Sequence, residues 1–298
     1  WEDQLCEMLR LGRESGRRDS IVVVAEGAID RLGQRITSEH VQRALEEGLG
    51  EDVRITVLGH VQRGGSPSAF DRYMSTVLGA ASVADVLAAS AADEPQIVGL
   101  RNNRIVRIPL VDAVSATHAI AAAAEAGRYD EVLERRGRSF RESVIRQRVL
   151  NQVFPGASRP SAAPRTLAVL HAGGLAPGMD AAARAVVRFA LDRGHRVLGV
   201  QDGFVGLAAG DVRELAWISV NVWGTTGGAE LGTTRHDLTE PDVAAIAATV
   251  EREGIDTLVL IGGWSGYAAC HDLLVARGRF PAVAALSVLA IPATIDND

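Results

Sequence analysis

The sequence has few cysteines, no long apolar run and no excess of positive charge. Only two of its 298 residues are cysteines, Cys6 and Cys270. Two cysteines so far apart match no metal-ligand spacing, and this sparse usage indicates a reducing, cytoplasmic compartment. The most apolar late stretch, residues 280–295, contains two prolines, so it is too short and too interrupted to span a bilayer.

Acidic residues outnumber basic ones, 37 to 31, which gives a formal net charge of −6. Proteins that bind nucleic acid are usually basic, so that class is disfavoured, and we interpret the arginines between residues 135 and 148 as the solvated face of a helix. An acidic protein that binds phosphorylated metabolites must gather its arginines locally. We therefore predict no nucleic-acid partner and no membrane partner.

What the sequence does contain is an ordinary globular composition, with 47% hydrophobic and 23% charged residues. This excludes a disordered tail or a low-complexity scaffold, because enough apolar surface is present to offset chain entropy. The length suggests two domains or one large α/β domain. The chain begins with Trp1, without a signal peptide, and ends at Asp298 directly after a strand-like run. Both ends look cut, so we expect a piece of a longer protein.

Helical and strand periods alternate along most of the chain, which favours an α/β fold. In the first part, the pattern predicts strands at 21–25 and 53–58, a hairpin at 96–108, and helices at 36–49, 68–91, 111–126 and 129–138. In the last part, it predicts strands at 166–171, 196–200, 257–261 and 287–291, with helices at 179–193 and from 239 to near 254. Thr37 or Ser38 is the expected cap of the first helix. Asn102 and Asn103 are expected at the hairpin turn, and Thr239 with Asp242 resembles a capping box.

A segment rich in proline, glycine and serine, residues 141–165, separates these two parts. Such a composition is typical of an interdomain linker. The expected organisation is one domain at 1–140, the linker at 141–165 and a second domain at 166–298, with no internal repeat.

The strongest local feature of the first part is the run from Arg54 to Arg63. A predicted strand delivers Arg54, and the glycine-rich loop after it presents His60 and Arg63. Ligands bind at the carboxyl ends of strands in open α/β sheets, and a guanidinium donates two parallel hydrogen bonds to phosphate. Glu26, at the end of the first predicted strand, can accept hydrogen bonds from sugar hydroxyls. The alternatives are a solvated turn with surface arginines and, for Glu26, a helix cap or a surface ion pair.

The second part contains two glycine loops at predicted strand ends, Gly173–Gly178 and Gly262–Gly263. A loop between a strand and a helix N-terminus suits phosphate through its amides and the helix dipole. The first loop is not a Walker A motif, and no Rossmann fingerprint is present, which disfavours an oxidoreductase. Asp296 and Asp298 follow the last predicted strand, where they can act as a base, hold Mg²⁺ or simply form an acidic terminus.

Several motifs, taken in their order, resemble 6-phosphofructokinase in its tandem, eukaryotic-type form. The first part carries VAEGAID at 24–30, VLGHVQRGGSPSAFDR at 57–72 and RGRSF at 136–140. The second part carries APGM at 176–179, QDGF at 201–204, LGTTR at 231–235, IGG at 261–263 and TIDND at 294–298. The resemblance covers essentially the whole chain. It implies Rossmann-like lobes with mostly parallel sheets, in which each half is incomplete: the end of a catalytic half precedes the linker, and the start of a second half follows it.

The resemblance implies a substrate site in the catalytic half. Fructose 6-phosphate would be bound by Glu26, Arg54, His60, Val61, Gln62 and Arg63. His60 and Arg63 would hold the 6-phosphate, and Arg54 would reach the site of a neighbouring subunit in a homo-oligomer. ATP and Mg²⁺ would serve the parent enzyme, a cytoplasmic kinase of glycolysis. Its nucleotide loops, magnesium aspartate and catalytic base would lie upstream of Trp1, so this chain alone is expected to be inactive.

The second half departs from the catalytic pattern. Leu175 stands where catalytic copies carry aspartate, Gly174 belongs to a degenerate nucleotide loop, and Trp264 replaces the aspartate that binds magnesium. An indole cannot coordinate Mg²⁺, so we expect no metal or nucleotide there and a regulatory role. The resemblance implies an allosteric site for fructose 2,6-bisphosphate or a similar effector, with contacts at Arg235, Thr294, Ile295, Asp296, Asn297 and Asp298. Asp296 is the counterpart of the catalytic base and is still aspartate.

Two alternatives stay open. The pyrophosphate-dependent relative favours Gly-Tyr where this chain has Gly59-His60, and lysine where it has Ala293, so both positions favour ATP. The other alternative is a non-catalytic sugar-phosphate-binding relative. A Gly-Gly-Asp-Gly-Ser motif in an upstream half would distinguish an enzyme from it.

Overall fold

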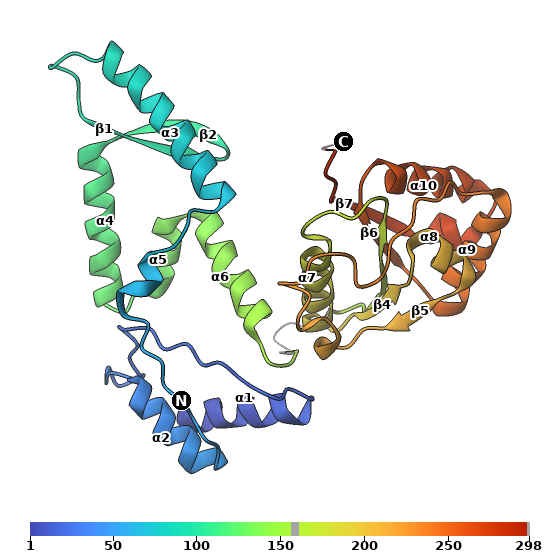
Figure 1. The fold of residues 1–298 in the computed structure, drawn as a ribbon, viewed down its shortest axis with the longest axis horizontal. Coiled ribbons are helices and arrows are strands. Elements are labelled where there is room, and N and C mark those ends of the chain that lie inside the picture. Colours follow the sequence, from blue (N-terminus) through green and yellow to red (C-terminus); the bar gives the residue numbers. More distant parts are fainter. Residues whose placement is uncertain (156–160, 297–298) are drawn as a thin grey trace. The chain divides into compact units, whose positions relative to one another are not determined.

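The computed structural model describes residues 1–155 and 161–296. Asn297 and Asp298, two of the expected effector contacts, lie outside the described residues, as does the part of the expected linker at 156–160. The chain divides into two compact units, one formed by 1–53 with 147–298 and the other by 54–146. Figure 1 labels the helices and strands along the chain. None of the helices in the described ranges is long and apolar enough to cross a membrane.

The first unit is built on a five-stranded sheet in the order β5-β4-β3-β6-β7. Its strands are β3 (Thr166–Ala172), β4 (Arg196–Val200), β5 (Val212–Glu214), β6 (Thr257–Gly262) and β7 (Ser287–Pro292). All neighbouring pairs are parallel except β4 with β5. The apolar runs of β3, β4 and β6 are buried along most of their length, as expected for strands covered on both faces. The predictions of β3, β4, β6 and β7 are confirmed.

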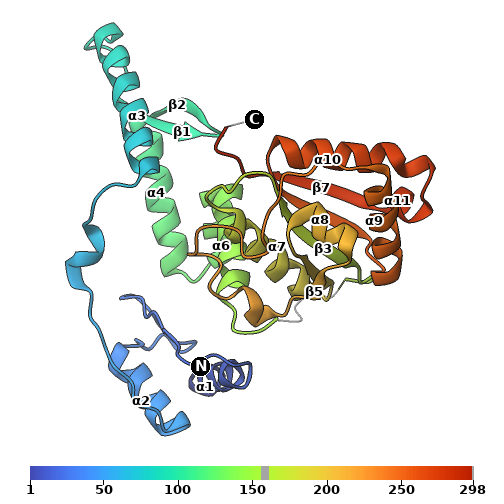
Figure 2. The same cartoon turned by 45° about the vertical axis from the view of Figure 1, so that its right-hand side comes forward.

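Helices cover both faces of this sheet (Figure 2). Helix α7 (Met179–Asp192) packs on the face to which Val169 of β3 points. The opposite face, with Ala168 and Leu170, is covered by α8 (Gly203–Ala209), α9 (Glu240–Glu253), α10 (Trp264–Val275) and α11 (Pro281–Ala285). Successive residues of β3 therefore enter opposite cores, as the pleat of a strand requires. The predicted α/β class with a mostly parallel sheet is confirmed.

A small satellite core joins the two N-terminal helices, α1 (Glu2–Glu14) and α2 (Ser38–Leu49). Its buried members are Cys6 of α1 with Val41 and Leu45 of α2. Thr37 caps α2 by accepting a hydrogen bond from the backbone amide of the third helical residue at 3.2 Å, as predicted.

Two of the predicted strands are wrong. Residues 21–25 and 53–58 pair with no other strand in the part of the chain that the structure describes. Ile21 and Val23 are 91% and 89% exposed, whereas the alternate valines contact the satellite core. Successive side chains of this segment therefore face opposite ways, although all four of residues 21–24 are apolar. A strand also needs a neighbour for its hydrogen bonds, and a pattern within one segment cannot supply that neighbour.

The second unit contains one hairpin and several helices. Its elements are the 3-10 helix η1 (Gly59–Arg63), α3 (Ala69–Ala88), β1 (Gln96–Arg101), β2 (Arg104–Pro109), α4 (Leu110–Glu125), α5 (Tyr129–Arg136) and most of α6 (Arg138–Asn151). The predicted hairpin is confirmed, with Asn102 and Asn103 at φ 51° and 56°. Two positive φ values in a two-residue turn match the twist of the strands, and asparagine tolerates that conformation.

Helix α6 runs through the first part of the predicted linker. Arg138 and Arg146 both pair with Glu142, at 2.6 and 2.8 Å, and ion pairs four residues apart stabilise a helix. The proline- and glycine-rich composition begins only after this helix, so the expected linker starts within a helical stretch. The interpretation of the arginines at 135–148 as a solvated helix face is confirmed. The compact units divide the chain after residues 53 and 146, and the boundaries at 140 and 165 stay a prediction.

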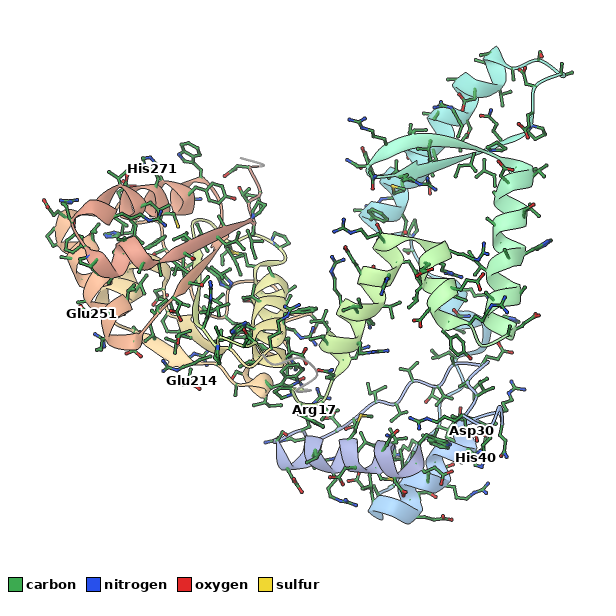
Figure 3. All side chains as sticks on the ribbon, turned by 180° about the vertical axis from the view of Figure 1, so that it is seen from behind. Arg17, Asp30, His40, Glu214, Glu251 and His271 are labelled. Atoms are coloured by element: carbon green, nitrogen blue, oxygen red, sulfur yellow. The ribbon has the colours of Figure 1, made fainter. Side chains whose placement is uncertain are left out.

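The backbone carbonyl of Gln152 accepts hydrogen bonds from several side chains of the first unit that are distant in the sequence. It accepts hydrogen bonds from Arg188 at 3.0 Å and Trp217 at 3.2 Å, and Arg17, labelled in Figure 3, reaches it at 3.5 Å. Arg188 is buried, and its guanidinium stacks 4.2 Å from the Trp217 ring centroid. Burial, and then the charges of Arg184 and Arg17, lower the pKa of Arg188 to about 9, so it remains protonated at neutral pH.

Both cysteines are buried free thiols. Cys6 donates weakly to a carbonyl of α2 at 3.4 Å. Burial raises the pKa of the Cys270 thiol to about 12, because the charged thiolate is disfavoured inside the apolar core.

The capping box at the start of α9 predicts a pH-dependent contribution to stability. Asp242 accepts hydrogen bonds from the amide and hydroxyl of Thr239, and it contacts His236 at 3.0 Å. These bonds, those from Thr239 first, lower the pKa of Asp242 to about 2. We expect Asp242→Asn to lower the free energy of unfolding by about 1 kcal/mol at neutral pH, the usual value of a cap.

Because the folded-state pKa lies below the unfolded one, this contribution is present above about pH 4 and is lost as pH falls toward about 2. Urea unfolding of wild type and variant between pH 6 and pH 3 measures the difference. The exposed Asp237→Asn is the matched control. A difference that stays constant over this range would contradict the assignment.

Candidate functional site

Three neighbouring parallel strands end at one edge of the sheet in the first unit. Strand pairing puts Ala172 of β3 beside Gly262 of β6, and Gly262 beside Pro292 of β7. The amide of Ala293 donates to the Gly262 carbonyl at 2.9 Å, which holds the segment after β7 against its neighbour. This edge of an open α/β sheet is where ligands bind, so the loops after these strands form the candidate site.

Glycines let two of these loops approach each other. Gly173 has φ +103°, and a Cβ added there would lie 3.1 Å from Ser265 Oγ and 3.6 Å from the Gly263 amide. Helices α7 and α10 begin directly after these loops, at Met179 and Trp264. The first amides of a helix lack intrahelical partners and lie at the positive end of its dipole, which suits an anion.

Residues 230–235, which we call the threonine strap, are tied to the first glycine loop. Thr233 Oγ1 donates to the Gly173 carbonyl at 3.0 Å, and the Gly173 amide donates to the Thr234 carbonyl at 2.9 Å. Thr234 Oγ1 in turn donates to the Asp202 carbonyl at 2.8 Å. These hydrogen bonds fix the backbone of the strap, and so they fix the position from which the Arg235 side chain extends.

Arg235 lies over Gly174. A Cβ added at Gly174 would be only 2.9 Å from Arg235 Nη2, so the guanidinium occupies space that any other residue at 174 would need. The structure therefore brings together two residues that the sequence assigned separately, one to a degenerate nucleotide loop and one to an effector site. Their juxtaposition places a full positive charge beside the glycine loop.

Two polar residues near this loop were missed by sequence reasoning. His171 is the penultimate residue of β3, Asp180 is the second residue of α7, and both are buried. Burial lowers the pKa of His171, while the charge of Asp180 acts in the opposite direction. The signal in the sequence was a histidine within an otherwise apolar strand, which by itself does not distinguish a site residue from a core residue.

The strand ends of this unit do not suit a metal ion. Leu175 and Trp264 are 59% and 69% exposed, and neither loop offers a carboxylate in their place. Asp296 and Ile295 are exposed, and the Asp296 amide donates to Thr294 Oγ1 at 3.1 Å. In the described part of the chain, no group of three or more histidine, cysteine or acidic side chains could hold a metal. The residues present here do not fit Mg²⁺.

In the second unit, η1 carries two of the predicted substrate contacts. His60 and Arg63 are three residues apart, and side chains at this spacing eclipse in a 3-10 helix, so both project from one face. Gly59 and Gly65 flank the turn at φ +56° and +122°, conformations that favour glycine. The local fold thus brings His60 and Arg63 together.

The remaining predicted contacts are exposed. Val61 and Gln62 lie on η1 itself, and Arg54 precedes it in the same unit. Glu26 belongs to the first unit, where its backbone carbonyl accepts a hydrogen bond from Arg35 at 3.2 Å. Glu26 and the η1 residues therefore come from different compact units.

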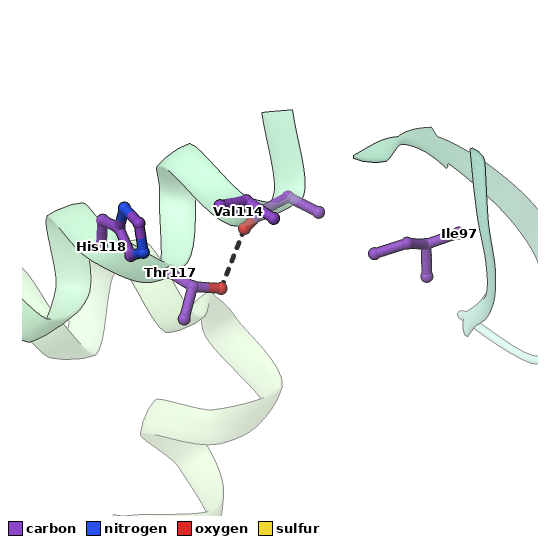
Figure 4. Close-up of a pocket in the computed structure, with 5 residues that line it drawn as sticks. Ile97, Val114, Thr117 and His118 are labelled. Carbon is purple, nitrogen blue, oxygen red and sulfur yellow. Dashed lines mark hydrogen bonds between the residues drawn. The ribbon is translucent and has the colours of Figure 1, made fainter. Parts of the chain in front are cut away.

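A shallow apolar pocket of about 240 Å³ lies elsewhere in the second unit (Figure 4). It is lined by Ile97 of β1 and by Ala113, Val114, Thr117 and His118 of α4. Thr117 Oγ1 donates to the Ala113 carbonyl at 2.8 Å, so its hydroxyl is satisfied within the helix. No predicted site residue lines this pocket, and it does not contribute to the candidate site.

The family model for phosphofructokinase matches residues 2–86 and 166–298. The chain belongs to the phosphofructokinase family. It is 40% identical over 298 residues to the muscle-type ATP-dependent 6-phosphofructokinases of Canis lupus familiaris and Homo sapiens. These alignments cover 100% of this chain and 38% of each relative, so the chain spans well under half of their length.

Two solved phosphofructokinase structures are similar over the whole chain. The structure from Saccharomyces cerevisiae has a TM-score of 0.92 at 33% identity and covers 100% of this chain and 39% of that one. The T-state structure from Pichia pastoris has a TM-score of 0.89 at 34% identity and covers 100% and 34%. The expected phosphofructokinase fold is confirmed, and the motifs of both parts belong to one family.

The close approach of Arg235 to Gly174 predicts different costs for two neighbouring substitutions. Gly174 has a φ that any residue adopts, so Gly174→Ala requires only the end of the Arg235 side chain to move. We expect the free energy of unfolding to change by less than about 0.5 kcal/mol, as for most surface substitutions. Gly173→Ala places alanine at φ +103° and should cost about 1–3 kcal/mol. Urea unfolding measures both, and equal costs would contradict the described loop geometry.

Proposed function

We propose that the protein to which this chain contributes is an ATP-dependent 6-phosphofructokinase. It transfers a phosphoryl group from ATP to fructose 6-phosphate, with Mg²⁺, and yields fructose 1,6-bisphosphate, a step of glycolysis in the cytoplasm. It works as a homo-oligomer. The observation that carries the proposal is the pair His60 and Arg63 on one face of η1, in a chain of this family whose relatives are named for this reaction.

The catalytic half, residues 1–140, supplies the acceptor side of the reaction. His60 and Arg63 hold the 6-phosphate, and the neighbouring glycines let the backbone approach an oxyanion closely. Arg54 reaches the site of a neighbouring subunit, and Glu26 accepts hydrogen bonds from sugar hydroxyls. Phosphoryl transfer depends mainly on positioning and charge neutralisation, and this chain contributes the positioning of the acceptor.

The second half, residues 166–298, is a regulatory site for fructose 2,6-bisphosphate or a similar bisphosphorylated sugar. Support comes from Arg235 over Gly174, from two helix N-termini at the same edge, and from the lack of carboxylates at 175 and 264. An anion can bind there through amides and the guanidinium without a metal. Thr294 and Asp296 contribute from the segment after β7.

The η1 pair gives the test of the enzymatic proposal. We expect Arg63→Ala to raise the KM for fructose 6-phosphate about 10- to 150-fold, the equivalent of about 1.5–3 kcal/mol for hydrogen bonds to a charged group. Steady-state kinetics of the full-length protein with Mg-ATP provides the measurement.

Arg104→Ala, an exposed arginine in the same unit, is the matched control and should leave KM unchanged. Equal KM values for Arg63→Ala and wild type would overturn the substrate assignment. Turnover with pyrophosphate but not with ATP would favour the pyrophosphate-dependent relative. Binding without any turnover would favour the non-catalytic alternative.

A second test addresses the regulatory half. We expect Arg235→Glu to weaken fructose 2,6-bisphosphate binding more than about 100-fold, because a charge-assisted bond is replaced by repulsion. Calorimetry on the full-length protein measures the affinity. Arg213→Glu makes the same charge change on the exposed strand β5 and should bind normally. Full-strength binding by Arg235→Glu would exclude Arg235 from the site.

A further inference from the structure

The threonine strap crosses the end of the sheet from one face to the other. Leu231, its second residue, is fully buried in the core that α7 covers. Leu238, three residues beyond its end, packs against the core on the opposite face. Between these two leucines, Thr233 is bonded to the loop that follows β3. The strap therefore carries Arg235 across the edge of the sheet where the candidate site lies.

Upstream of Arg235, hydrogen bonds anchor the backbone of the strap at both of its ends. The Glu230 amide donates to Oδ1 of the buried Asp180 on α7 at 2.8 Å. The Thr234 carbonyl accepts from the Gly173 amide at 2.9 Å. These bonds fix the chain up to the residue before Arg235, but they do not fix the chain that follows it.

Directly downstream of Arg235, the anchor is the side chain of His236. Its Nε2 lies 3.0 Å from Oδ2 of Asp242, in the first turn of α9. The same oxygen accepts hydrogen bonds from the amide of Thr239 at 2.8 Å and from its hydroxyl at 2.6 Å. His236 thus meets an acceptor that the capping box already holds in place. A fixed acceptor reduces the side-chain entropy that such a pair usually loses.

The direction of this hydrogen bond follows from the charge of the carboxylate. Bonds from Thr239 first, and then from His236, lower the pKa of Asp242 to about 2, so it is ionised at neutral pH. An ionised carboxylate only accepts hydrogen bonds, so the Nε2 of His236 carries a proton and donates. Either the neutral or the cationic imidazole can make this bond, and the amide of a glutamine can supply a similar donor.

We propose that His236 is a positioning residue for the bisphosphorylated sugar, an inference that rests on the proposed effector site. Arg235 is exposed, and a long exposed side chain loses rotamer freedom when it binds an anion. With the chain anchored at Thr234 on one side and at His236 on the other, the guanidinium extends from one backbone position, over Gly174. His236 acts on the ligand's phosphate through Arg235.

Calorimetry of fructose 2,6-bisphosphate binding to the full-length protein tests this role. We expect His236→Ala to weaken binding about threefold to tenfold, the cost of ordering one long side chain on binding. His236→Gln keeps a donor near the position of Nε2 and should bind within about twofold of wild type. His271→Ala is the matched control, because His271 lies 3.6 Å from Asp272 on exposed α10, away from the strap (Figure 3). It should bind normally.

A double-mutant cycle separates positioning from a merely structural role. In an Arg235→Ala background, the side chain that His236 positions is missing, so adding His236→Ala should change the affinity by less than about twofold. A general loosening of the lobe, or a direct contact of His236 with the sugar, would weaken binding by the same factor in both backgrounds.

The outcomes separate this inference from the effector site on which it rests. If wild type does not bind the sugar, both are wrong. If wild type binds, Arg235→Glu does not, and His236→Ala binds as tightly as wild type, only the positioning role is wrong. An equal loss in both backgrounds, or His236→Gln as weak as His236→Ala, would also overturn it. A loss that glutamine restores and that Arg235→Ala cancels supports it.

Discussion

The parallel pairing of β3, β6 and β7 is the constraint on which the candidate site depends. These strands stop at the same level, so the residues after Ala172, Gly262 and Pro292 are placed side by side although they lie far apart in the chain. The strands are held by cores on both faces, and their buried apolar side chains set the position of the loops. A small displacement of a loop would therefore have to disturb close packing, which makes this edge a rigid platform for recognition.

Under the proposed function, recognition at this edge relies on the backbone and on arginine. Leu175 and Trp264 leave the glycine loops without a carboxylate, so the local field is governed by Arg235 and by two helix N-termini. A site that combines carboxylates with a metal suits a nucleotide that must react, whereas a site of fixed positive charge suits an anion that must only bind. Under the proposed function, a few substitutions at strand ends separate a regulatory copy of this scaffold from a catalytic one.

How much of the fold and of the candidate site could be predicted depends on how far apart in the sequence the interacting residues lie. Local signals worked: the Thr239 capping box and the Asn102-Asn103 turn are decided by neighbouring residues and are present. The strand predicted at 21–25 was wrong because a strand must pair with another strand, which lies elsewhere in the sequence and cannot be inferred from this segment. The motif match supplied Gly174 and Arg235, but their contact depends on how the threonine strap crosses the loop. His171 was missed because only the fold shows that a polar residue in an apolar strand is buried without partners.

The buried thiol of Cys270 has a consequence for how this fold can be followed in solution. Thiol reagents attack the thiolate, and a pKa of about 12 leaves almost none of it at neutral pH while the core stays closed. Exposure of α10 to water would return the sulfur to its ordinary acidity and make it reactive. The rate at which Cys270 is alkylated therefore reports how often the core around α10 opens. The cysteine is part of the first unit itself, so no added label is needed.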